Sequence, residues 1–217
     1  MKSYRRHWKA LAALLTVALF LGGFAATASA APAGMTQAQK DFIATVGAMA
    51  SEDMKQSDIL ASLTLAQAIL ESGWGTSALA VNANALFGIK ADSRWSGRVY
   101  SKSTLECYDG VNFVREDALF RAYDSWQQSV SDHSAFLLAS SRYAAVIGER
   151  DYRKACTAIH SAGYATDPGY AQKLVRLIET YDLTSYDAGG AGPGAALGLV
   201  SRLLSALRDA GVRCPFR

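Results

Sequence analysis

Glu71 stands in the segment of the sequence best suited to acid–base chemistry. It follows the largely apolar residues 65–70, which continue a helical pattern, and it precedes Ser-Gly-Trp-Gly, where that helix is expected to end. Apolar and aromatic surroundings favour the protonated form of a carboxyl, and the partial negative charge of a helix C-terminus acts in the same direction. Such a carboxyl suits a general acid near neutral pH, although the pattern alone equally allows a solvated surface charge.

The sequence contains no motif for a cofactor, a metal or another nucleophile. Its GGAGPG stretch lacks the Lys-Ser/Thr of a phosphate loop, and neither GxSxG, HExxH nor an EF-hand loop occurs. Cys107, Cys156 and Cys214 have no metal-ligand spacing, so we expect no metal and no cofactor. An odd number of cysteines allows at most one internal bridge, and Cys107 with Cys156 is preferred because both fall inside the expected folded domain.

The elements that must position Glu71 are mostly helices. Thr36 is expected to cap a helix that runs to Met49, and Ser57 is expected to cap the next one. That second helix carries an apolar stripe and should end at Gly73, because glycine readily takes the left-handed conformation of a helix terminus. Glu71 would then lie in its last turn.

Residues 94–122 show a different pattern. Short β-like runs lie on both sides of Asp109-Gly110, a pair typical of a hairpin turn. The chain is therefore predicted to be α+β, mainly α, with one small antiparallel sheet inserted between helices. Further helices are expected to follow the sheet, beginning at Asp124 or Ser125, around Tyr152, and after Asp167-Pro168.

The first thirty residues have the features of a signal peptide. Four basic residues open the chain, an apolar stretch over residues 10–24 follows, and Ala28-Ser29-Ala30 supplies a cleavage site. The stretch is short for a membrane span, which takes about 20 strongly apolar residues, so export is favoured over an uncleaved anchor. Removing residues 1–30 lowers the net charge from +3 to −1, because they carry four Lys or Arg and no acid. Nothing then indicates binding to nucleic acid or an integral membrane span after processing.

Residues 36–186 are expected to form one domain, and residues 188–217 a linker and tail. The linker begins with a Gly/Ala-rich stretch over residues 188–194 that has little capacity to pack. Residues 197–207 could form a short amphipathic helix. The sequence leaves open whether this tail docks on the domain, binds a partner or stays unstructured.

Three motifs in order resemble the glucosaminidase domain of glycoside hydrolase family 73. They are AQAILESGWGTSALA around Glu71, NALFGIK over residues 84–90, and GYATDPGYA over residues 163–171. The resemblance covers roughly residues 36–186. It implies a lysozyme-like fold with a helical lobe, a small β-lobe and a cleft between them, which agrees with the arrangement predicted from the periodicity.

The resemblance implies catalytic roles for three residues. Glu71 matches the family's general acid, and Glu106, in the context Thr-Leu-Glu, matches a second carboxylate from the β-lobe. Asp109 and Glu116 are nearby acids that could take the place of Glu106, and the acetamido group of the substrate could replace a second carboxylate altogether. Tyr164 matches the catalytic-site tyrosine of the family.

Four further residues are candidates for substrate binding. Trp74 and Phe87 could form aromatic walls against the C–H faces of sugars, or they could be plain core. Asn84 could hydrogen-bond the substrate, although the family commonly has a second Asn at the next position, where this chain has Ala85. Tyr170 matches the later tyrosine of the GYATDPGYA motif, and its place on an apolar stripe also allows a core role.

These observations predict an exported endo-β-N-acetylglucosaminidase that acts in the periplasm or extracellularly at the cell wall. It would cleave the β-1,4 bond between N-acetylglucosamine and N-acetylmuramic acid in peptidoglycan glycan strands, and would work as a monomer. One alternative is a muramidase or lytic transglycosylase on the same fold. Another is a non-catalytic glycan-binding module, against which the presence of Glu71 in full context argues.

Overall fold

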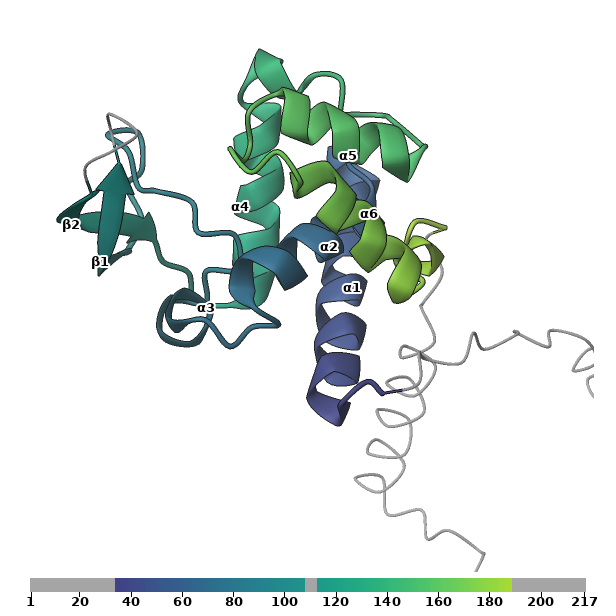
Figure 1. The fold of residues 1–217 in the computed structure, drawn as a ribbon, viewed down its shortest axis with the longest axis horizontal. Coiled ribbons are helices and arrows are strands. Elements are labelled where there is room, and N and C mark those ends of the chain that lie inside the picture. The colour runs from purple at the N-terminus through teal and green to yellow at the C-terminus, as the bar shows by residue number, and fades with distance from the viewer. Residues whose placement is uncertain (1–33, 108–112, 189–217) are drawn as a thin grey trace, which may run out of the picture. The chain divides into compact units, whose positions relative to one another are not determined.

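The structure is a computed structural model that describes residues 34–107 and 113–188, with residues 104–107 and 113–116 described by their backbone alone. In this part of the chain, helices dominate and one hairpin interrupts them (Figure 1). The elements in chain order are α1 (Gln37–Ser57), α2 (Ala61–Ser72), α3 (Ala78–Ala83), β1 (Val99–Cys107), β2 (Phe113–Arg121), α4 (Trp126–Leu138), η1 (Ser141–Tyr143), α5 (Tyr152–Ser161), α6 (Tyr170–Thr180) and η2 (Leu183–Tyr186).

Helix α1 begins where the sequence predicts and ends later. Thr36 caps it in a capping box with Gln39, which satisfies free backbone N–H groups of the first turn. The helix continues past Met49 to Ser57, because no glycine or proline interrupts residues 48–57. The prediction that Ser57 caps the next helix is therefore wrong: α2 starts after Leu60, which makes no side-chain cap.

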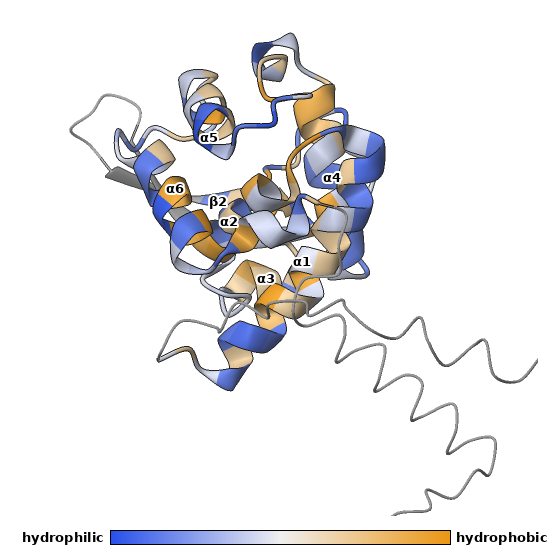
Figure 2. Cartoon of the chain, turned by 90° about the vertical axis from the view of Figure 1, so that its right-hand side faces the viewer, coloured by the Kyte–Doolittle hydropathy of each residue, from blue (hydrophilic) through white to orange (hydrophobic). Residues whose placement is uncertain are grey.

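Helix α2 lies in the middle of the helical elements. Residues 61–69 are buried on every side, and α1, α5, α6 and η2 all pack against it (Figures 1 and 2). A helix that is buried on all sides is a core helix, whereas α6 in Figure 2 carries both hydrophilic and hydrophobic residues, as expected with one side facing water. Only the last turn of α2 reaches the surface, and Glu71 is in that turn.

The small sheet is one antiparallel hairpin of two long strands. The register pairs Val99 with Arg121 at the base and Cys107 with Phe113 at the far end. A second, smaller core attaches the base to α3, and a bridge between Lys90 and Phe120 adds to it. The predicted fold class, mainly α with a small antiparallel sheet, is confirmed, although Asp109-Gly110 in the turn lies outside the described residues.

The predicted disulfide is wrong, because Cys156 is a free thiol. It lies fully buried on α5, and burial raises the pKa of this thiol to about 12, so it behaves as a small apolar core residue.

Several sequence predictions fall outside the described residues, namely those for Cys214, for the signal peptide over residues 1–30 and for nearly all of the tail. Among the helices that the structure describes, none is long and apolar enough to cross a membrane. Residues 34–107 and 113–188, which the structure describes, contain no group of three or more His, Cys, Asp or Glu placed to hold a metal ion.

Candidate active site

Glu71 lies on the wall of a surface pocket of about 430 Å³. The last turn of α2 supplies it, and the loop after α5 and the first turns of α6 supply the opposite wall. The pocket therefore brings together residues almost a hundred positions apart in the sequence. Its lining residues are Leu70, Glu71, Tyr164, Ala165, Thr166, Asp167, Tyr170 and Lys173.

A chain of hydrogen bonds leads from the core to the carboxyl of Glu71. The amide of Gln67, one helical turn before Glu71 and fully buried, donates to the hydroxyl of Tyr170 over 3.2 Å. That hydroxyl donates to Oε1 of Glu71 over 2.8 Å. Tyr170 is itself buried, and burial raises its pKa far above the usual value, so it stays a hydrogen-bond donor at any working pH.

The pKa of Glu71 is raised above its ordinary value. Partial burial of the carboxyl against the pocket wall raises this pKa, and the hydrogen bond from Tyr170 lowers it by a smaller amount. The residue as a whole is exposed to solvent, while its carboxyl is partly buried and accepts the hydrogen bond from Tyr170. A carboxyl whose protonated form is favoured, on the wall of an open pocket, can donate a proton to a bound substrate.

A left-handed turn after α2 fixes the end of the helix. Gly73, Trp74 and Gly75 all have positive φ angles, of 56°, 62° and 76°. A side chain at Gly75 would come within 2.8 Å of the Trp126 ring and 2.9 Å of the Phe42 ring, so only glycine fits there. The left-handed conformation costs about 1–2 kcal/mol for a residue such as Trp74, and packing of its ring offsets this cost.

Trp74 packs into an aromatic cluster beneath the turn. Its ring meets Phe42 edge-on at 6.1 Å and Tyr181 at 5.0 Å between centroids. It is not among the residues that line the pocket of Glu71. The contacts of Trp74 indicate that it holds the turn in place, and its role as a sugar platform stays a prediction.

A row of aromatic rings continues from the pocket along the protein. Tyr170 stacks near Tyr164 at 5.9 Å, and Tyr164 meets Tyr143 at 6.3 Å and His133 at 5.8 Å. Burial raises the pKa of Tyr164 well above its usual value, so this hydroxyl also stays protonated. Phe87 stacks face to face on His133 at 4.0 Å and is buried, so its described contacts are those of a core residue.

His133 is a neutral, fully buried imidazole behind this row. Neither ring nitrogen has a hydrogen-bond partner among the described residues, and burial lowers the pKa of His133 to about 3. In the unfolded chain a histidine has a pKa of about 6.5, so the unfolded state binds one more proton between these values. Above pH 6.5 the histidine is neutral in both states, and its contribution to the free energy of unfolding is complete. As the pH falls from 6.5 toward 3, the unfolded state takes up the proton and this contribution is lost.

We expect His133→Phe to be less sensitive to acid than the wild type. Phenylalanine keeps the stacking on Phe87 and cannot be protonated, so between pH 7 and 4.5 the variant should lose roughly 2 kcal/mol less unfolding free energy. Urea denaturation at the two pH values measures this. His160→Gln, which removes the partly exposed histidine of α5, is the control and should keep the wild-type loss. Equal losses in all three proteins would contradict the assignment.

Two other predicted site residues belong to other elements of the fold. Asn84 ends α3 in a left-handed conformation, and its amide donates to the carbonyl of Tyr123 over 3.1 Å. Glu106 lies on β1 with its backbone opposite Val114. The structure brings Glu71, Tyr164 and Tyr170 together, while the predicted substrate contact of Asn84 and the catalytic role of Glu106 stay predictions.

Three residues of this site were not identified from the sequence. Gln67 holds the hydroxyl of Tyr170, and its spacing of four from Glu71 on one helix is the signal that could have revealed it. Asp167 and Lys173 line the pocket and pair with each other over 2.5 Å. Lys173 and the backbone N–H of Gly169 both hydrogen-bond Asp167 and lower its pKa, so this carboxylate stays ionised near Glu71.

Comparison with protein families and curated proteins gives consistent matches. A family model described as "Glucosaminidase: Mannosyl-glycoprotein endo-beta-N-acetylglucosaminidase" matches residues 47–183. The exo-glucosaminidase LytG of Bacillus subtilis is 37% identical over 154 residues, which are 69% of this chain and 54% of LytG. The peptidoglycan hydrolase FlgJ of Salmonella typhimurium is 38% identical over 157 residues, 70% of this chain and 49% of FlgJ. The matched segments thus span about half the length of these relatives.

Solved structures resemble this one over the same region. The catalytic domain of the autolysin Auto from Listeria monocytogenes aligns with a TM-score of 0.64 and 32% identity, covering 71% of this chain and 90% of that one. A truncated glycoside hydrolase domain of Salmonella typhimurium FlgJ aligns with a TM-score of 0.54 and 37% identity, covering 65% and 95%. The described fold is therefore that of these catalytic domains.

Proposed function

Since the chain belongs to the glucosaminidase family, glycoside hydrolase family 73, we propose that it hydrolyses peptidoglycan glycan strands with Glu71 as the general acid. The proposed bond is the β-1,4 linkage on the reducing side of N-acetylglucosamine. The single observation that carries the proposal is the carboxyl of Glu71, which lines an open pocket, has a raised pKa and accepts a hydrogen bond from Tyr170. We further propose export by way of residues 1–30, because the substrate lies outside the cytoplasm.

The proposed reaction begins with proton transfer from Glu71 to the glycosidic oxygen. The bond between this oxygen and the anomeric carbon breaks, and positive charge develops on the sugar ring. Water then adds its oxygen to the anomeric carbon, and its proton leaves to a base. Either Glu106 or the acetamido oxygen of the sugar supports the charge or directs the water.

The two tyrosines of the pocket would act through their protonated hydroxyls. Tyr170 orients the carboxyl of Glu71 and is itself held by Gln67, so the acid has a defined direction toward the pocket. Tyr164 lines the same pocket and stacks near Tyr170, and this position supports the proposal that its hydroxyl contacts the N-acetyl group. Its raised pKa keeps this hydroxyl uncharged, as donation to an acetamido oxygen requires.

Product analysis tests the proposed bond. Purified peptidoglycan is digested, the new reducing ends are reduced with borohydride, and the fragments are identified by mass spectrometry. We expect reduced N-acetylglucosamine ends on fragments of intermediate length, as an endo-acting enzyme produces. Reduced muramic acid ends would identify a muramidase, and anhydro-muramic ends a lytic transglycosylase. Release of small fragments alone from the start would indicate exo action, the activity named for LytG.

A binding module would behave differently in the same experiment. The protein would sediment with insoluble peptidoglycan and no new ends would form. Such a result would contradict the proposed acid, whatever the affinity for the glycan.

A further inference from the structure

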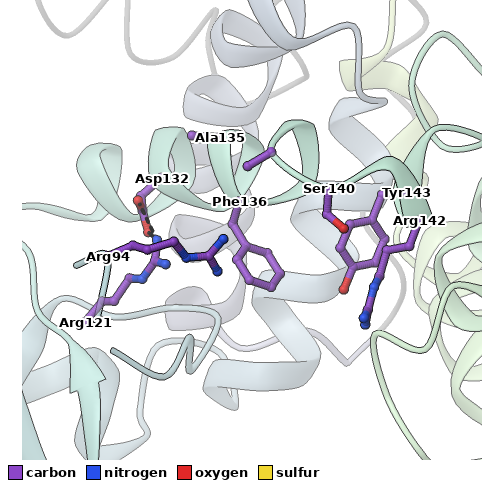
Figure 3. Close-up of a pocket in the computed structure, with 9 residues that line it drawn as sticks. Arg94, Arg121, Asp132, Ala135, Phe136, Ser140, Arg142 and Tyr143 are labelled. Carbon is purple, nitrogen blue, oxygen red and sulfur yellow. Dashed lines mark hydrogen bonds and ion pairs between the residues drawn. The ribbon is translucent and has the colours of Figure 1, made fainter. Parts of the chain in front are cut away.

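A second pocket, with a volume of about 550 Å³, lies between the base of the hairpin and the helical elements. Arg94 and Arg121 come from the hairpin side, and α4 and η1 supply the other walls (Figure 3). None of the residues that carry the proposed acid chemistry lines it. Its lining residues are Arg94, Arg121, Asp132, Ala135, Phe136, Ala139, Ser140, Arg142 and Tyr143.

The pocket combines an aromatic floor with guanidinium groups on opposite sides. In Figure 3 the guanidinium groups of Arg94 and Arg121 lie on one side of the Phe136 ring and that of Arg142 lies on the other, beside Tyr143. The rings of Phe136 and Tyr143 are 5.9 Å apart. A ligand that fits this surface has apolar atoms for the rings and negative charge at its edge.

The charges of the pocket are not all free to bind a ligand. Asp132 accepts two hydrogen bonds from Arg121, each of 3.0 Å, and this largely buried pair is held between the Trp95 and Phe136 rings. Arg94 is exposed and pairs with Asp92 over 2.6 Å. Arg142 is exposed and has no carboxylate partner in the part of the chain that the structure describes. Arg142 is therefore the main anchor for an anion, and Arg94 can be shared with one.

The second pocket is connected to the site of Glu71 by the aromatic row. Tyr143 lines the second pocket, Tyr164 lines the first, and their rings are 6.3 Å apart. The two pockets therefore have adjoining walls, and a flexible branch of a strand held over Glu71 can reach the second pocket.

We propose that this second pocket binds the acidic stem peptide of peptidoglycan, with Arg142 and Arg94 as the carboxylate contacts. The inference rests on the proposed function, since it assumes that the strand lies over Glu71. A stem peptide carries free carboxylates next to aliphatic side chains, and planar guanidinium groups bind carboxylates through paired hydrogen bonds. The aromatic floor favours this ligand over a phosphate-bearing polymer, whose anions carry few apolar atoms.

The test measures binding rather than hydrolysis. The full chain with Glu71→Gln is mixed with purified glycan strands that either carry stem peptides or have been stripped of them by an amidase. We expect tighter binding to the stem-bearing strands. Adding Arg142→Gln should weaken that binding roughly fivefold, and Arg94→Gln together with Arg142→Gln at least tenfold, with binding to stripped strands unchanged. Both side chains are exposed, so the variants should fold.

Arg176→Gln is the matched control. Arg176 is an exposed arginine of α6 that lies outside this pocket, so its replacement removes the same charge and should keep the preference for stem-bearing strands. The proposal is overturned if the parent protein shows no such preference, or if Arg142→Gln weakens both strand types equally or neither. Equal weakening would place the pocket against the glycan or an attached anionic polymer. Failure of the proposed hydrolysis appears separately, as intact strands with the wild-type protein.

Discussion

Glu71→Gln is expected to lower kcat/KM for peptidoglycan hydrolysis by about 10³-fold. Glutamine keeps the size of the side chain and can still accept the hydrogen bond from Tyr170, but it has no proton to give to the glycosidic oxygen. The fold should be retained, and the thermal midpoint should be equal or higher, because a partly buried carboxyl is removed. Release of reducing ends from purified peptidoglycan measures the activity, and thermal unfolding measures the stability.

Glu179 offers a matched control for this substitution. It is an exposed glutamate that also accepts a hydrogen bond from a tyrosine, Tyr152, over 3.0 Å. Glu179→Gln makes the same chemical change in a similar pairing and should leave the activity within about twofold of wild type. If Glu71→Gln kept more than a tenth of the activity, Glu71 would not be the proton donor.

Tyr170→Phe is expected to lower kcat by about thirtyfold and to move the alkaline limb of the pH profile to higher pH. The lower kcat follows because the carboxyl of Glu71 loses the group that orients it. The hydrogen bond from Tyr170 favours the ionised form of Glu71, so its removal leaves the effect of burial unopposed and raises the pKa further. A general acid must be protonated, and a higher pKa therefore extends activity toward alkaline pH.

The measurement is kcat and kcat/KM against pH, compared with those of Tyr152→Phe. Tyr152 donates to Glu179 on the surface, so its replacement removes a similar tyrosine–glutamate bond away from the pocket and should leave the profile unchanged. A merely structural role for Tyr170 would lower the activity without moving the limb. A limb that stays in place or moves to lower pH would contradict the proposed contact.

The local features of the site could be predicted from the sequence because neighbours along the chain determine them. Gly73 ends α2 as expected, because a left-handed residue is needed there and glycine takes this conformation at little cost. The position of Glu71 in the last turn follows directly. The capping box at Thr36 and the start of α4 after Ser125 are decided in the same way.

Tertiary packing decided which aromatic residues surround the acid. The motif places Trp74 three residues after Glu71, yet the ring of Trp74 packs on Phe42 and Tyr181 below the turn. The rings that share the pocket with Glu71 belong to Tyr164 in the loop after α5 and to Tyr170 on α6, and only the packing of α5 and α6 against α2 brings them near. Sequence spacing carries no information about such a contact, because it depends on how two helices pack.

The same limit applies to the core. The apolar pattern of α2 predicted one buried side, but burial on every side follows from the elements packed around it. Cys156 is a buried free thiol because its helix faces that core, and such burial cannot be predicted from the position of a cysteine in the sequence. The sequence by itself thus determined the mainly helical fold with one small antiparallel sheet, and the place of Glu71 in the last turn of α2. The tertiary structure alone decided the raised pKa of that residue and its hydrogen-bond partner, because burial and long-range contacts exist only after the helices have packed.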